Sequence, residues 1–263
     1  MSEINYGINC IDCLEGLKLL KDSSIDLTVT SPPYDDLRKY KGYSFDFEPI
    51  ARELYRITKE GGVVVWVVGD ATIKGSETGT SFRQALYFKK IGFNLHDTMI
   101  WNKQNCSSIG SMNRYENIFE YMFILSKGKP KTANIITDKP NKRAGELQYG
   151  SIRQKDGTVR KTSQYGKRAI AEFGRRSNVW NVFPAKSPKE RLHPAPFPEQ
   201  LAQDHILSWS NEGDIVLDIF SGSGTTHKMA LLNNRKFIGF EISQEYVEIE
   251  KQRIKDCGLS DEN

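Results

Sequence analysis

Apolar residues recur along the chain in two kinds of pattern. Helical spacing appears at 12–20, 47–58, 81–90, 197–208, 225–232 and 244–254. Short runs rich in β-branched residues predict strands at 25–30, 63–68, 95–101, 118–125, 215–220 and 237–242. The run VVVWVV at 63–68 does not alternate, which is typical of a strand buried on both faces of a parallel sheet. The alternation of strands and helices along the chain predicts an α/β fold with a doubly wound, mostly parallel sheet.

Prolines and glycines punctuate these elements. Pro32-Pro33 should stop the strand at 25–30, and Gly61-Gly62 are expected to end the helix at 47–58. We expect loops at 35–43 and 70–80.

The 263 residues fit one large domain, alone or carrying an insertion. Hydrophobic residues make up 38% of the chain, an ordinary globular composition. No signal peptide is visible, and the longest strictly apolar run, 63–68, is far too short to span a bilayer. We therefore expect a cytoplasmic protein without a membrane partner.

Charge is distributed unevenly. Residues 127–176 hold fourteen Lys or Arg and four Asp or Glu, so the rest of the chain carries a net charge of −6. This segment shows no strong periodicity and is long for a structureless connection. It fits either a surface for a polyanionic partner or a solvated loop. The chain accordingly divides into 1–126, an insert at 127–185, and 186–263.

The four cysteines, at positions 10, 13, 106 and 257, suggest no cofactor. Cys10 and Cys13 form a C-x-x-C pair, but no second pair follows to complete a zinc site. Buried, reduced thiols are the favoured interpretation, and no metal site is predicted.

A glycine-rich turn follows the strand at 215–220 and opens a helix. Its residues are Asp218, Phe220, Gly222, Gly224 and Thr225. The pattern is not the full dinucleotide fingerprint, because His227 stands where the third glycine is required. Glu241 closes the next strand, where an acid can accept hydrogen bonds from ribose hydroxyls. A simple strand-to-helix turn remains the alternative.

The turn Thr30-Ser-Pro-Pro-Tyr34 is the most specific feature of the chain. Two prolines that break a strand would account for Pro32 and Pro33. They would not account for the flanking hydroxyl and aromatic groups.

The two turns, in this order and with a basic region between them, resemble the β group of DNA amino-methyltransferases from bacterial restriction–modification systems. The resemblance covers nearly the whole chain. It implies the S-adenosylmethionine-dependent methyltransferase fold, that cofactor, and catalytic roles for Ser31, Pro32, Pro33 and Tyr34. Cofactor contacts are implied for Asp12, Phe197, Pro198, Asp218, Phe220, Gly222, Gly224, Thr225 and Glu241. For Asp12, a helix N-cap is an equal and compatible role.

Methyl transfer to an exocyclic amine needs hydrogen-bond acceptors, because the amine lone pair is delocalised into the base. The Ser31 hydroxyl and the Pro32 carbonyl are suitable acceptors, and Tyr34 can stack on a flipped base. In the family, Ser in the first place is usually associated with cytosine N4 and Asp with adenine. We therefore predict cytosine-N4 methylation of double-stranded DNA. Adenine-N6 methylation, an inactive DNA-binding protein and an RNA methyltransferase are the alternatives.

Other chemistries fit less well. Methylation of cytosine C5 needs a Pro-Cys nucleophile, and no cysteine here follows a proline. A G-x-S-x-G hydrolase elbow is absent.

The resemblance gives the basic insert a role in target recognition, with Arg153, Gln154, Arg168 and Arg175 as examples of DNA-contacting residues. The loop with Arg38, Tyr40 and Tyr43 either folds over the flipped base or is an ordinary surface loop. A cognate restriction endonuclease is a possible partner, and both a monomer and a homodimer remain open.

Overall fold

The computed structural model describes residues 4–33, 45–104, 113–184 and 198–260. The chain divides into two compact units. Unit 1 comprises Met1–Asn134 and Asn178–Asn263, and unit 2 comprises Ile135–Ser177. Unit 2 spans fewer residues than the predicted insert 127–185. Tyr34, Phe197 and the loop 35–43 lie outside the described residues, as does Cys106.

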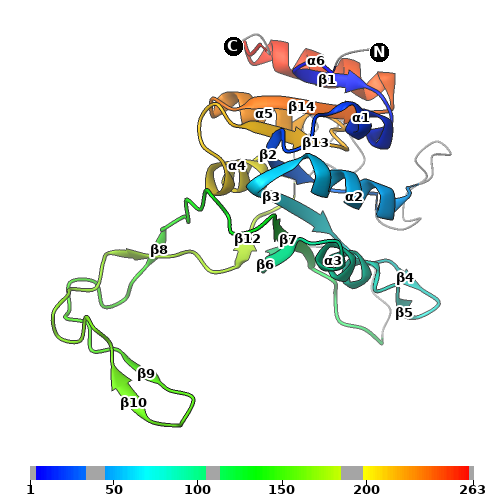
Figure 1. The fold of residues 1–263 in the computed structure, drawn as a ribbon. Helices are drawn as coiled ribbons and strands as arrows, with labels where there is room; N and C mark the ends of the chain where they lie inside the picture. Colours follow the sequence, from blue (N-terminus) through cyan, green and yellow to red (C-terminus); the bar gives the residue numbers. More distant parts are fainter. Residues whose placement is uncertain (1–3, 34–44, 105–112, 185–197, 261–263) are drawn as a thin grey trace. The chain divides into compact units, whose positions relative to one another are not determined.

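Unit 1 is built on an eight-stranded sheet with the order β1-β14-β13-β2-β3-β7-β6-β12 (Figure 1). Its strands are β1 (Gly7–Cys10), β2 (Ile25–Thr30), β3 (Thr58–Val68), β6 (Asn94–Asn102), β7 (Phe119–Ser126), β12 (Val179–Asn181), β13 (Ile215–Asp218) and β14 (Lys236–Glu241). Strand β7 is antiparallel to both neighbours, and the other pairs are parallel. The predicted mostly parallel sheet is confirmed.

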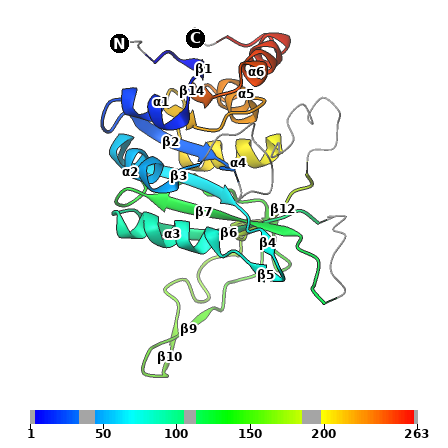
Figure 2. The same cartoon turned by 90° about the vertical axis from the view of Figure 1, so that its right-hand side faces the viewer.

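The described part of the chain also forms six helices and a small hairpin. The helices are α1 (Cys13–Leu19), α2 (Phe47–Ile57), α3 (Thr80–Lys90), α4 (Glu199–Trp209), α5 (Thr225–Leu232) and α6 (Gln244–Asp256). The hairpin consists of β4 (Thr72–Ile73) and β5 (Ser76–Glu77). Helices α1, α2 and α3 cover one face of the sheet and α4 and α5 the other (Figure 2), so two hydrophobic clusters sandwich the strands.

Strand β3 shows how the sequence pattern produces this core. Val64, Trp66 and Val68 enter one cluster, whereas Val63, Val65 and Val67 enter the other. All six side chains are at most 1% exposed, which confirms the prediction of a strand buried on both faces.

The glycine pair Gly61-Gly62 does not end a helix, and that prediction is wrong. Helix α2 already ends at Ile57, and both glycines lie inside β3. Gly61 has φ +77°, and a Cβ there would come within 2.8 Å of the Lys131 Cβ. Its N–H donates to the Lys127 carbonyl at 2.7 Å. The glycines therefore permit close approach of the chain that follows β7.

Strands β1 and β12 were not predicted. They occupy the two edges of the sheet and pair with β14 and β6, respectively. Their sequences, GINC and VWN, are too short to show a period, so pairing with a distant strand defines them.

Unit 2 contains two short antiparallel pairs. Strand β8 (Lys139–Pro140) pairs with β11 (Phe173–Gly174), and β9 (Ser151–Arg153) pairs with β10 (Val159–Lys161). Strands of two or three residues leave no visible period, which explains the irregular appearance of this segment in the sequence.

The cysteines only partly match expectation. Cys10 and Cys257 are exposed, which corrects the prediction of buried thiols. Cys10 is exposed because it ends a strand at the sheet edge. Burial raises the pKa of the Cys13 thiol to about 12, with a smaller contribution from Asp12, so this thiol stays protonated. Among the described residues, no helix combines the length and apolarity needed to cross a bilayer.

Candidate active site

The two turns singled out in the sequence meet at one place in the sheet. Strands β2 and β13 are parallel neighbours, with Leu27 beside Val216 and Thr28 beside Leu217. From β13 the chain continues to β14 on one side, and from β2 it continues to β3 on the other. Doubly wound sheets bind ligands at the carboxyl ends of strands where the winding direction reverses in this way.

Asp218 joins the two turns directly. Its Oδ1 accepts hydrogen bonds from Thr30 Oγ1 at 2.7 Å and from the Phe220 N–H at 3.0 Å. Its Oδ2 accepts one from Thr226 Oγ1 at 2.7 Å. The side chain is 1% exposed. The carboxylate thus fixes the end of β2 against the start of the glycine-rich turn and the first residues of α5.

Burial also changes the acidity of this carboxyl group. Loss of solvation raises the pKa of Asp218 from 3.8 to about 6, although the three hydrogen bonds oppose this shift. The charged form is therefore held at a cost that the hydrogen bonds only partly offset.

The glycines of the turn are required by backbone conformation and by space. Gly222 and Gly224 have φ of +55° and +79°. A Cβ at Gly224 would lie 2.5 Å from the Glu250 Cγ. A side chain at Gly224 is therefore excluded, and the turn packs closely against α6.

Glu241 and Asp12 stand at the carboxyl ends of the next two strands. Glu241 Oε2 accepts from the Gly222 N–H at 3.0 Å and Oε1 from the Ser243 N–H at 2.8 Å. Burial raises the pKa of Glu241. Because each carboxylate oxygen has two lone pairs, both retain capacity for a further donor. The Ile11 N–H donates to the Glu241 carbonyl at 3.0 Å, which brings the segment around Asp12 alongside.

The N-cap interpretation of Asp12 is confirmed. Its Oδ1 accepts from the backbone N–H groups of Leu14 at 2.9 Å and Glu15 at 3.2 Å. Among the described residues its Oδ2 has no hydrogen-bond partner, and the residue is exposed. Capping α1 therefore leaves one oxygen for a ligand.

The Ser-Pro-Pro turn begins directly after β2. Ser31 and Pro33 are half-buried and Pro32 is buried. Thr30, for which the sequence predicted no role, holds this turn through its hydrogen bond to Asp218. Pro198 is buried and serves as the N-cap residue of α4.

Helix α6 supports the glycine-rich turn from behind. Glu250 Oε1 accepts from Ser221 Oγ at 2.9 Å and contacts His227 Nδ1 at 2.7 Å. One turn later, Arg253 Nη1 donates to the Ser223 carbonyl at 3.0 Å and to Thr225 Oγ1 at 3.3 Å. Glu250 is fully buried, and burial raises its pKa despite the His227 contact.

Arg253 also connects the turn to α4. Its Nη2 donates to Glu199 Oε1 at 2.5 Å, and Lys228 Nζ donates to the same oxygen at 2.7 Å. Burial favours a higher pKa for Glu199, but the hydrogen bonds and charges of Lys228 and Arg253 outweigh it and lower the pKa. The first residue of α4 is thereby tied to both α5 and α6.

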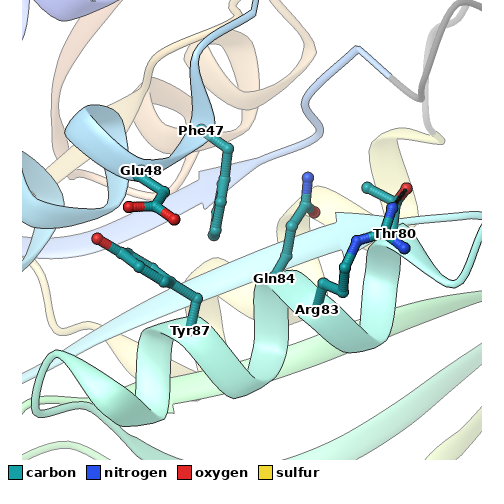
Figure 3. A pocket seen from close by; sticks show the side chains of 6 residues that line it. All are labelled: Phe47, Glu48, Thr80, Arg83, Gln84 and Tyr87. Atoms are coloured by element: carbon teal, nitrogen blue, oxygen red, sulfur yellow. Dashed lines mark hydrogen bonds between the residues drawn. The ribbon is translucent and has the colours of Figure 1, made fainter.

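Aromatic side chains link the site to the neighbouring helices. Phe45 packs edge-on against Phe220 with ring centroids 5.6 Å apart, and it stacks on Trp66 at 6.5 Å. Beyond this cluster, a hollow of about 310 Å³ lies between α2 and α3 (Figure 3). It is lined by Phe47, Glu48, Thr80, Arg83, Gln84 and Tyr87. None of these residues belongs to the two turns.

The donor set suits S-adenosylmethionine. The turn carries glycines in place of side chains, and carboxylates with spare acceptor capacity stand at the ends of β14 and β1. This cofactor has ribose hydroxyls and an adenine amine as donors, and it carries no phosphate. Among the described residues no cluster of three or more His, Cys, Asp or Glu side chains is arranged to hold a metal.

Solved structures of other proteins share this fold. A structure of the PvuII DNA methyltransferase (cytosine-N4-specific) aligns with a TM-score of 0.68 at 23% identity, covering 99% of this chain and 90% of that one. A putative DNA modification methylase from Thermus thermophilus, complexed with S-adenosylmethionine, aligns with a TM-score of 0.65 at 24% identity, covering 95% and 93%. The predicted methyltransferase fold is confirmed.

Sequence relatives narrow the class to a family. The model of the DNA methylase family matches residues 25–252. The orphan methyltransferase M.BamHII of Bacillus amyloliquefaciens is 61% identical over 242 residues, which cover 89% of this chain and 90% of the relative. The chain therefore belongs to the β-group DNA amino-methyltransferases, a family that methylates cytosine N4 or adenine N6 with S-adenosylmethionine as the methyl donor.

Proposed function

We propose that this protein methylates the exocyclic N4 of cytosine in double-stranded DNA. The observation that carries the proposal is the position of Ser31, at the end of β2 and one residue from the Thr30–Asp218 bond. That bond places the Ser-Pro-Pro turn beside the glycine-rich turn. An amine held at the Ser-Pro-Pro turn would face a cofactor held at the glycine-rich turn.

Some residues of the site would bind the cofactor, and others would stabilise the charge that develops on the target amine. Glu241 and Asp12 accept hydrogen bonds from the ribose and adenine, and Gly222 and Gly224 admit the cofactor to the backbone. S-adenosylmethionine supplies a methyl group on a positively charged sulfur. The Ser31 hydroxyl and the Pro32 carbonyl would accept hydrogen bonds from the amine N–H groups, which localises the nitrogen lone pair and stabilises its developing positive charge.

The choice of cytosine over adenine rests on the serine at position 31. It is supported by the similarity in fold to a methyltransferase named as cytosine-N4-specific. Adenine N6 is the second candidate, because the family includes enzymes that act on either base.

Unit 2 would be the target-recognition part of the enzyme. It contains eleven Lys or Arg and four Asp or Glu, so it carries most of the excess positive charge noted in the sequence. Contacts to phosphates release counterions, and DNA affinity should therefore fall steeply with added salt. A flat salt response would remove this role.

Nucleoside mass spectrometry tests the reaction. DNA of broad sequence coverage is incubated with the protein and S-adenosylmethionine, digested and analysed. N4-methylcytosine is the expected product. N6-methyladenine would keep the mechanism and overturn the assignment of the base. No methylated nucleoside, together with retained DNA binding, would favour an inactive DNA-binding protein.

A further inference from the structure

The β9–β10 hairpin of unit 2 is uncovered on both faces. Its ladder pairs Ser151 with Lys161, Ile152 with Arg160, and Arg153 with Val159. The Gln154 N–H donates to the Thr158 carbonyl at 2.7 Å, which extends the ladder to the tip. All six strand residues are exposed, including Ile152 at 54% and Val159 at 61%.

A two-stranded ribbon exposed on both sides is only marginally stable in water. Here the base of the hairpin is reinforced by its neighbours. Lys161 Nζ lies 4.5 Å from the centre of the Tyr165 ring, and Tyr149 packs edge-on against Tyr165 at 5.2 Å. Toward the tip, support comes from the turn itself, where Asp156 Oδ1 accepts from the Thr158 N–H at 2.9 Å and its hydroxyl at 2.7 Å. The hairpin is thus held in shape while its faces stay free.

Positive charge is present on both faces of this ribbon. Side chains alternate along a strand and directly paired residues share a face. Arg153 and Lys161 therefore lie on one face and Arg160 on the other, with Lys155 at the tip. The one acidic residue of the hairpin, Asp156, is occupied by the turn. A ribbon that binds a flat anionic surface needs cations on one face only. A ribbon inside a DNA groove has phosphates on both sides, so cations on both faces favour a groove.

We propose that the β9–β10 hairpin enters the major groove of double-stranded DNA as a two-stranded ribbon. The major groove of B-DNA is about 12 Å wide and admits such a ribbon, whereas the minor groove is about 6 Å wide and must be widened to take one. Arg153 and Arg160, on opposite faces, contact the phosphates of opposite groove walls. The tip, 154–158, reaches the base edges. This inference rests on the proposed action on double-stranded DNA.

The test compares variants that remove the same charge from two places in unit 2. Arg153→Ala combined with Arg160→Ala removes one cation from each face of the hairpin. A double variant of Arg143→Ala and Lys142→Ala is the matched control, because both residues are exposed and lie outside the hairpin. DNA affinity is measured by fluorescence anisotropy across a salt series, on a duplex containing the site that the enzyme methylates. Binding of S-adenosylmethionine without DNA verifies that unit 1 is intact.

The hairpin variant should bind DNA about tenfold or more weakly than the control variant, and its salt slope should fall by about two. Dimethyl sulfate footprinting of the wild-type complex should show protection of guanine N7 in the major groove. Equal affinity of the two variants, or protection confined to adenine N3 in the minor groove, would overturn the inference. Failure of the wild-type protein to methylate any duplex would instead count against the proposed function.

Discussion

The glycine-rich turn and the β9–β10 hairpin differ in how firmly the rest of the protein holds them. The turn is fixed from three directions, by Asp218 below it, by Glu241 beside it, and by Glu250 and Arg253 of α6 behind it. The hairpin is held by its own ladder, by the Asp156–Thr158 hydrogen bonds of its turn and by a few ring contacts. The same cofactor binds in every turnover, so a preformed site lowers the free-energy cost of ordering side chains on binding. The cationic side chains of the hairpin, in contrast, stay solvated until DNA binds.

Ser31→Ala should have the largest effect, because it removes a functional group and leaves both regions as they are. We expect kcat to fall by about 10²- to 10³-fold, as for loss of a group that stabilises charge in a transition state. Binding of S-adenosylmethionine, measured by calorimetry, should be unchanged. Equal loss of cofactor binding and turnover would show that Ser31 supports the fold instead.

Asp218→Asn tests whether the fixed turn holds a costly charge. The pKa of Asp218 is raised when the protein folds, so its favourable contribution is complete below pH 3.8 and is lost as pH rises through about 6. The asparagine is isosteric and does not titrate. Its unfolding free energy, relative to wild type, should therefore rise by up to about 3 kcal/mol between pH 4 and pH 7.

Chemical denaturation at a series of pH values provides this measurement. Glu241, whose pKa burial also raises, remains in both proteins and cancels in the difference. Glu250 also remains, but its charge contributes to the raised pKa of Asp218, so that contribution belongs to the measured difference. A difference that is constant with pH would contradict the prediction.

Gly224→Ala and Gly157→Ala compare the two regions at matched backbone conformations. Both glycines have positive φ, +79° and +86°, so alanine strains each by about 1–2 kcal/mol. Only at Gly224 would the new Cβ clash with Glu250, since nothing lies within 4 Å of a Cβ at Gly157. We expect cofactor affinity to fall about tenfold for Gly224→Ala and to stay unchanged for Gly157→Ala. Similar affinities in the two variants would mean that the turn is not tightly packed.

Arg253→Ala should have the smallest effect of the series. It removes the hydrogen bonds from α6 to the Ser223 carbonyl and Thr225, and also the ion pair with Glu199. Cofactor affinity should fall about fivefold, in line with the net contribution of about 1 kcal/mol from a typical hydrogen bond. Arg253→Lys should restore part of it. Lys251→Ala, on an exposed position of the same helix, is the control and should match wild type. A lowered melting temperature with unchanged cofactor affinity would show that Arg253 stabilises the fold and does not contribute to cofactor binding.

The sequence predicts the parts of the site that depend on local pattern. Strands such as β2 and β13 are visible because their residue types and breaking residues act within a few positions. The capping role of Asp12 follows from its place before a helix. Proximity of the two turns follows from the rule for doubly wound sheets, once the alternation of strands and helices is seen.

The support behind the glycine-rich turn could not be predicted in this way. Glu250 and Arg253 lie among the other charged residues of α6, and in sequence they resemble a solvated helix face. Only packing of α6 against the turn shows that Glu250 is buried. His227 was visible as a departure from the dinucleotide pattern, but its partner is distant in sequence. Gly61 was misassigned for the same reason, since close approach of distant backbone is not a local property.

The point at which unit 2 leaves unit 1 has an evolutionary consequence. The Asn134 N–H donates to the Ser208 carbonyl at 2.8 Å, and the Asn178 carbonyl accepts from the Ile100 N–H at 2.8 Å. Both junctions are thus anchored inside unit 1, whatever sequence runs between them. Doubling the length of a flexible connection costs only about 0.6 kcal/mol. The intervening segment can therefore be exchanged without loss of either anchor. If unit 2 has the proposed role in target recognition, new DNA specificities can arise by recombination while the chemistry of unit 1 is inherited intact.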